Sequence, residues 1–319
     1  MLGNTFKMGL LSVLLLGKIA MTTGANISIA IKFEIDSTKG PFSHMVLDRR
    51  GRNIYAGAMN SLYQLSSDLK LIKSVTTGPK DDNPNCQPQN INASCDKPKT
   101  PMNVYNKVLV IDYNNNKLIS CSSIYHGTCE RYNLSDLESK DPESYVPVVA
   151  NNAISTTVAF IAPGPLRGSN VLYVAASRTS DGQSVFRDLV PALASRKLET
   201  FELFYKGTNT SSSKSIQTMH RNIFQVDYIY GFSSDNFSYF VTVQRQNPST
   251  ESYISKLIRV CQADKYYNSY AEVQLNCMYN GTLYNLAQAA YVENVGFRLA
   301  EDMRISYFED VLYVVCSIG

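Results

Sequence analysis

The run Val171-Leu-Tyr-Val-Ala-Ala-Ser177 returns near the end of the chain as Val311-Leu-Tyr-Val-Val-Cys-Ser317. Both runs are short and rich in β-branched and aromatic residues. They are apolar at consecutive positions, which is typical of a strand covered on both faces. Three more runs share this character, at residues 53–60, 117–123 and 237–244. The five runs start 64, 54, 66 and 74 residues apart, so they form a loose repeat about one four-stranded sheet long.

A short polar turn and another apolar strand precede each of these runs. The preceding strands are predicted at residues 44–48, 104–113, 156–161, 225–232 and 304–308. Helical periodicity is scarce, and helices are expected only at 134–138, with Asn133 as the cap, and at 283–294. The pattern predicts an all-β chain. Its simplest closed arrangement is a β-propeller, and tandem β-sandwiches are the alternative.

The composition indicates a folded, exported chain. Of 319 residues, 44% are hydrophobic and 18% are charged, so a sizeable core is available and general disorder is excluded. The net charge of +3 comes without a basic stripe, which argues against nucleic acid as a partner. Seven Cys residues together with abundant Tyr and Asn favour a secreted β-rich protein over a cytosolic enzyme.

The N-terminus has the pattern of a secretory signal. Lys7 precedes an apolar run at residues 8–17, and small residues follow at 22–25, so we predict a signal peptide at 1–25; a buried N-terminal helix is the alternative. Lys18 interrupts the run, which is too short to span a membrane. Exposed N-glycosylation is expected at the six Asn-x-Ser/Thr sequons, which are Asn26, Asn92, Asn133, Asn209, Asn236 and Asn280.

The first four cysteines fall into two close couples. Cys86 and Cys95 are nine residues apart in a loop rich in Pro and Asn, which cannot propagate a helix or a central strand. Cys121 and Cys129 are eight apart, a spacing that suits a bridge across a hairpin. Disulfides are favoured over a zinc site because only one His lies nearby. Cys261, Cys277 and Cys316 remain, an odd number for an exported chain.

From residue 42 onward the chain resembles the N-terminal sema domain of plexins, particularly the A type. The resemblance is carried by segments 78–86, 105–113, 117–129, 195–198, 230–240, 253–261, 268–277 and 286–292. Among them are Tyr-Gly-Phe-Ser-Ser from Tyr230 and Ser-Tyr-Ala-Glu-Val from Ser269. The hepatocyte growth factor receptor group shares the Gly-Pro and Ser-Cys-x-Ser features, so a receptor with a downstream tyrosine kinase is the alternative. A secreted decoy fragment is a further one.

The resemblance implies a seven-bladed β-propeller, of which residues 26–319 would cover the first four to five blades and stop before closure. It implies an extracellular receptor domain at the plasma membrane that binds a semaphorin in signalling such as axon guidance and cell migration, with receptor self-association or a co-receptor. It also implies bridges Cys86–Cys95 and Cys121–Cys129, and partners for Cys261 and Cys277 beyond residue 319. Plexins usually carry an aromatic where this chain has Cys316.

We expect a binding module without a catalytic site or a cofactor. The three His residues, at 44, 126 and 220, fit no hydrolase or metalloprotease spacing, and no P-loop is present. The long segment 177–197 is the predicted recognition loop, in the region where the resemblance places the semaphorin surface. Its candidate contact residues, with Phe186 as an aromatic anchor, are Arg178, Asp181, Phe186, Arg187, Arg196 and Lys197.

Overall fold

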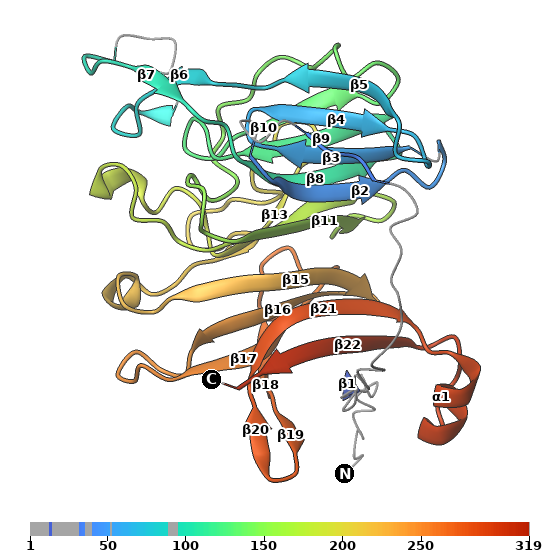
Figure 1. Cartoon of the computed structure of the whole chain (residues 1–319). Coiled ribbons are helices and arrows are strands. Elements are labelled where there is room, and N and C mark those ends of the chain that lie inside the picture. Colours follow the sequence, from blue (N-terminus) through green and yellow to red (C-terminus); the bar gives the residue numbers. More distant parts are fainter. Residues whose placement is uncertain (1–12, 15–31, 36–39, 52, 89–94, 319) are drawn as a thin grey trace.

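The computed structural model describes residues 13–14, 32–35, 40–51, 53–88 and 95–318 (Figure 1). The predicted signal peptide lies outside this part, except for β1 (Val13–Leu14), which pairs in parallel with the last strand, β22. Asn26 and Asn92 also lie outside it.

The first two blades are built from the N-terminal half of the described chain. The first is the sheet β2 (Phe42–Leu47), β3 (Ile54–Ala58), β4 (Ser61–Leu65) and β5 (Leu71–Thr76). A separate hairpin of β6 (Lys80–Asp82) and β7 (Thr100–Met102) follows it. The second blade is the antiparallel sheet β8 (Asn106–Asp112), β9 (Lys117–Ser122) and β10 (Cys129–Asn133).

The third and fourth blades have four strands each. The third contains β11 (Thr157–Pro163), β12 (Asn170–Ala176), β13 (Leu193–Arg196) and β14 (Ser213–Lys214). The fourth contains β15 (Val226–Ser234), β16 (Phe237–Arg245), β17 (Tyr253–Cys261) and β18 (Ala271–Leu275). Short 3-10 helices lie in the connections, η3 (Ser184–Phe186) and η4 (Thr218–His220).

The fifth blade pairs β21 (Leu286–Asn294) with β22 (Asp310–Ser317). Helix α1 (Phe297–Met303) connects these strands, and a hairpin of β19 (Cys277–Tyr279) and β20 (Thr282–Tyr284) precedes them. The blades succeed one another in chain order (Figure 1), and their first strands, β2, β8, β11, β15 and β21, contact each other in turn. This is the propeller arrangement, and five blades agree with the predicted extent.

Successive hydrophobic cores fill the space between neighbouring blades. Strand β12 shows how one strand serves two of them: Leu172 and Val174 pack toward the second blade, whereas Val171 and Tyr173 pack toward the fourth. All four side chains are at most 2% exposed. Burial of each apolar side chain stabilises the fold by about 1.5–3 kcal/mol. The continuous apolar runs are therefore explained by burial on both faces, as predicted.

Asparagines at the hairpin turns account for part of the Asn-rich composition. Asn60, Asn116, Asn236 and Asn280 all have positive φ and lie at or beside the turns that join adjacent strands. Asn tolerates this left-handed region better than other residues that carry a Cβ. The sequence therefore places Asn in tight turns of the first, second and fourth blades and of the β19–β20 hairpin.

Three local predictions were wrong. Residues 134–138 form turns, whereas 283–294 contribute to β20 and β21. The Ala-rich stretch is a strand because Ala287, Ala290 and Val292 pack into the core between the fourth and fifth blades, and this tertiary contact outweighs helix propensity. The strand expected at 304–308 does not form, since β21 already pairs with β22 and α1 leads into this segment.

Candidate ligand-binding groove

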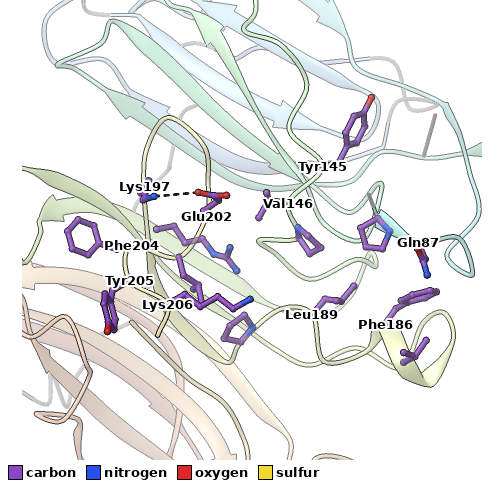
Figure 2. Close-up of a pocket in the computed structure, with 16 residues that line it drawn as sticks. Gln87, Tyr145, Val146, Phe186, Leu189, Lys197, Glu202, Phe204, Tyr205 and Lys206 are labelled. Carbon is purple, nitrogen blue, oxygen red and sulfur yellow. Dashed lines mark hydrogen bonds and ion pairs between the residues drawn. The ribbon is translucent and has the colours of Figure 1, made fainter. Parts of the chain in front are cut away.

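A groove with a volume of about 910 Å³ lies beside the second and third blades. We call it the blade 2–3 groove. It is lined by segments far apart in the sequence, which are residues 87–88, 145–147, 185–191, 196–197 and 202–206. Figure 2 shows Phe186 and Leu189 toward one end and Phe204 and Tyr205 toward the other. Its lining combines aromatic and aliphatic side chains with a small number of charges.

Two disulfides hold the walls at the Phe186 end of the groove. Cys121 and Cys129 face each other across β9 and β10 and are bridged, and Cys86 is bridged to Cys95. Both predicted pairs are therefore confirmed, and these four cysteines are disulfide partners rather than zinc ligands. Between the bridges, His126 at the hairpin tip makes a 2.7 Å hydrogen bond from its ring Nε2 to the Cys86 carbonyl oxygen.

Phe186 packs on this cross-linked platform. Its ring centroid lies 5.2 Å from that of His126 in an edge-to-face arrangement. The ring is half-buried, whereas the neighbouring Val185 is 68% exposed. Phe186 is therefore an anchor that fixes the 177–191 loop, and Val185 is the more accessible apolar side chain of the same 3-10 helix.

The rest of the loop is fixed by polar contacts. The Asn152 amide donates a 2.6 Å hydrogen bond to Asp181, and Arg187 Nε donates to the Gly182 carbonyl oxygen at 3.2 Å. Arg178 pairs with Asp188 at 3.1 Å, and Arg221 pairs with the same carboxylate at 2.7 Å. Burial opposes ionisation of Asp188, but the two guanidinium groups outweigh it, so the pKa of this carboxyl lies below its ordinary value.

Arg196 is the most deeply buried charge of the groove lining. It is 3% exposed, and its Nη1 donates a 2.8 Å hydrogen bond to the Phe201 carbonyl oxygen. Its Nε has no hydrogen-bond partner, and among the described residues no carboxylate forms an ion pair with it. Burial lowers the pKa of the guanidinium to about 10. A buried cation without an anion is costly, so this position favours a ligand that supplies negative charge.

The rim of the groove carries exposed charges. Lys197 pairs with Glu202 at 3.4 Å, as Figure 2 shows, and both side chains remain largely exposed. Lys206 also lies on the rim and is exposed. Such exposed charges contribute little to stability, but they can steer a charged partner toward the groove.

The predicted recognition loop at 177–197 is only partly confirmed, because its end forms β13 (Leu193–Arg196) and Arg196 therefore lies on a strand. The structure divides the predicted contact residues into two sets. Phe186, Arg196 and Lys197 line the groove, whereas Arg178 and Asp181 have their polar groups engaged in holding the loop. Arg187 likewise bonds to the loop backbone. The sequence reasoning missed residues 145–147 and 202–206, because nothing in their local pattern shows that they meet the 177–191 loop.

A second cavity, of about 780 Å³, adjoins the first strands of the first four blades. His44 on β2 and Lys107 on β8 both line it. Lys107 donates a 3.0 Å hydrogen bond to the Ala153 carbonyl oxygen, and burial lowers its pKa to about 8. Burial and then the Lys107 charge lower the pKa of His44. This cavity therefore holds a weakly basic lysine rather than a carboxylate dyad.

The described residues contain no group of three or more His, Cys, Asp or Glu side chains arranged to hold a metal ion. The His residues are dispersed, on β2, at the β9–β10 hairpin tip and in η4. Within the same part of the chain, no helix has the length and apolarity needed to cross a bilayer. Four sequons are described: Asn209, Asn236 and Asn280 are exposed, and Asn133 is partly buried.

Comparisons with known proteins identify the family. The chain is 36% identical to Plexin-A4 of Danio rerio over 313 residues, covering 90% of this chain and 16% of the relative. It is 32% identical to Plexin-A2 of Mus musculus, covering 90% of this chain and 16% of that protein. It therefore spans about a sixth of the length of these relatives. No protein-family model matches the chain.

Among solved structures, the plexin A4 full extracellular region superposes with a TM-score of 0.79 and 34% identity, covering 88% of this chain and 32% of that one. The chain thus corresponds to an extracellular segment, and the alternative of a growth factor receptor is not favoured. The sequence matches and the blade architecture agree. This chain belongs to the plexin family, as a homologue of the A-type plexins that carries five consecutive blades of their sema-domain β-propeller.

Proposed function

We propose that this chain is the ligand-binding part of a semaphorin receptor and that the blade 2–3 groove is its semaphorin contact surface. The single observation that carries the assignment of the groove is the buried Arg196 without a carboxylate, which lines the same groove as the exposed apolar side chains of Val185 and Leu189. The plexin homology supports a semaphorin as the partner. The receptor acts on the outer face of the plasma membrane, and a dimeric semaphorin brings two copies together.

The lining of the groove fits the physical chemistry of a protein interface. Energetically dominant interface residues are commonly an aromatic residue or Arg at a site from which water is excluded. Here Val185 and Leu189 are 68% and 38% exposed, and they lie beside the half-buried Phe186. An apolar side chain of the ligand would cover Val185 and Leu189. An Asp or Glu side chain of the ligand would pair with Arg196.

We infer a recognition function rather than a catalytic one. Among the described residues that line the groove, one carries a carboxylate, Glu202, which is paired with Lys197 and is exposed. A general acid or base needs a partner within hydrogen-bond reach of a reacting atom. The residues of the groove are instead arranged as an apolar surface with a buried cation, which suits binding.

The experiment measures binding of a panel of semaphorin ectodomains to the secreted chain by biolayer interferometry. The test variant is Val185→Asp, which places a negative charge on the most exposed apolar residue of the groove lining. Its matched control is Leu166→Asp on the same blade, because Leu166 is 62% exposed and lies outside the groove. We expect a loss of at least about tenfold in affinity for Val185→Asp and no change for the control.

A second variant pair tests the charge of the rim. Lys206→Glu is expected to slow association because it weakens electrostatic steering toward the groove, whereas Lys70→Glu on the first blade is the control. Arg196 itself is unsuited to charge reversal because it is buried and such a variant would be destabilised. Unchanged binding by both Val185→Asp and Lys206→Glu would show that the groove is not part of the semaphorin interface. Failure of every semaphorin to bind the unaltered chain would overturn the receptor assignment.

A further inference from the structure

Two cysteines that form no disulfide in this structure lie in contact in the fifth blade. Cys277 is the first residue of β19, and Cys316 is the next-to-last residue of β22. Their Sγ atoms are 3.0 Å apart although 39 residues separate them in the chain. Cys277 is 1% exposed, whereas Cys316 is half-buried. This contact was not expected, because the family resemblance implies a partner for Cys277 beyond residue 319.

The position of the pair gives it a structural consequence. Cys277 begins the β19–β20 hairpin, which forms a two-stranded sheet of its own with its tip at Asn280 and Gly281. Met278 and Leu283 of this hairpin are 64% and 40% exposed, so the hairpin projects from the blade. Cys316 belongs to β22 and lies opposite Ala287 of β21. A bond between the two sulfur atoms would tie the base of the hairpin to the sheet of the fifth blade.

We propose that Cys277 and Cys316 form a third disulfide of this chain, which fixes the sequon-bearing β19–β20 hairpin to β22. A disulfide has its sulfur atoms about 2.05 Å apart, so two sulfurs already in contact need only a side-chain adjustment of about 1 Å. The same chain holds two further disulfides, as is typical of proteins that fold in an oxidising compartment.

The oxidant is a small-molecule disulfide, such as glutathione disulfide. The more exposed thiol, Cys316, loses its proton and attacks one sulfur of the oxidant, so that a mixed disulfide forms and one glutathione thiol leaves. The Cys277 thiol then loses its proton and attacks Sγ of Cys316, which releases the second glutathione thiol. Two protein thiols are oxidised to one disulfide, and one glutathione disulfide is reduced to two thiols that take up the two protons.

Peptide mapping of the full secreted chain tests the proposal. The chain is alkylated under denaturing conditions without reduction, deglycosylated and digested with trypsin. Because Arg298 and Arg304 lie between the two cysteines, Cys277 falls in peptide 266–298 and Cys316 in the peptide that begins at Ile305. Cys261 falls in peptide 260–265 and serves as an internal reference. We expect peptide 266–298 to be linked to the peptide that begins at Ile305.

Two single-cysteine variants identify which cysteines form the link. Cys316→Ser should abolish the linked species completely and leave Cys277 alkylated, whereas Cys261→Ser should leave the link intact. If Cys316→Ser is not secreted, incubation of the unaltered chain with a graded ratio of reduced to oxidised glutathione gives the same answer through loss and recovery of the linked peptide. A link from Cys277 to a different cysteine, or alkyl label on both Cys277 and Cys316 in the secreted chain, would overturn the proposal.

Discussion

Gly182 offers the sharpest test of how the recognition loop is held. It lies in the 177–191 loop with φ of +78°, and a Cβ added there would lie 2.4 Å from the Pro84 carbonyl oxygen. Gly168, in the turn between β11 and β12, has the same φ of +78° but no atom within 4 Å of an added Cβ. The substitutions Gly182→Ala and Gly168→Ala therefore carry the same backbone strain, and they differ only in the steric clash.

The expected magnitudes follow from this pairing. An Ala residue in the left-handed region costs about 1–2 kcal/mol, and both variants lose the same unfolded-state entropy. In Gly182→Ala, Pro84 must also move away from the loop, because its backbone oxygen cannot stay 2.4 Å from a carbon atom. Such overpacking adds about 1–3 kcal/mol. Displacement at this point would also shift Phe186 relative to His126.

The assay compares urea unfolding midpoints of the two variants and the unaltered chain by circular dichroism, followed by semaphorin binding. We expect Gly182→Ala to be less stable than Gly168→Ala by about 1–3 kcal/mol and to bind more weakly. Gly168→Ala should bind as the unaltered chain does, since Gly168 lies outside the groove. Equal midpoints and equal affinities for the two variants would refute the claim that this close approach positions the loop.

Two further predictions concern the scaffold. Because burial lowers the pKa of Lys107 from 10.5 to about 8, the native state loses this proton before the unfolded state does, so stability should rise between pH 8 and 10.5. Lys107→Met should lack on the order of 2–3 kcal/mol of that rise in pH-dependent urea unfolding, and identical pH profiles would contradict the assignment. Leu172→Ala, in the core between the second and third blades, should lower the free energy of unfolding by about 2–5 kcal/mol. Leu166→Ala, at an exposed turn, should leave it almost unchanged. Unfolding midpoints measure both, and a similar loss of stability in the two variants would contradict the placement of the core.

The repeat of apolar runs was enough to predict the blades. A strand covered on both faces must be apolar at successive positions, and β12 and β16 satisfy this requirement in the structure. The two short cysteine spacings also predicted the two disulfides, because a bridge across a hairpin or a short loop joins residues close in sequence. The helix expected at 283–294 was wrong because its Ala and Leu residues favour a helix by propensity, whereas their burial in the core between the fourth and fifth blades selects the strand.

The groove was only partly predictable. Phe186 and Arg196 stood out because an aromatic residue and Arg in a long loop are typical interface residues, yet only the fold shows that Arg196 is buried without a carboxylate. The segments 145–147 and 202–206 reach the groove through the radial packing of two blades. Nor could the sequence show that Cys277 meets Cys316, since their contact depends on a hairpin and a strand 39 residues apart.

Hydrogen–deuterium exchange of the secreted chain, with and without a bound semaphorin ectodomain, tests the central claim most directly. We predict slower exchange on binding at residues 185–191 and 202–206, two segments that line the blade 2–3 groove. The β19–β20 hairpin of the fifth blade should exchange at the same rate in both states. Binding accompanied by protection outside the groove, with 185–191 and 202–206 unchanged, would contradict this claim.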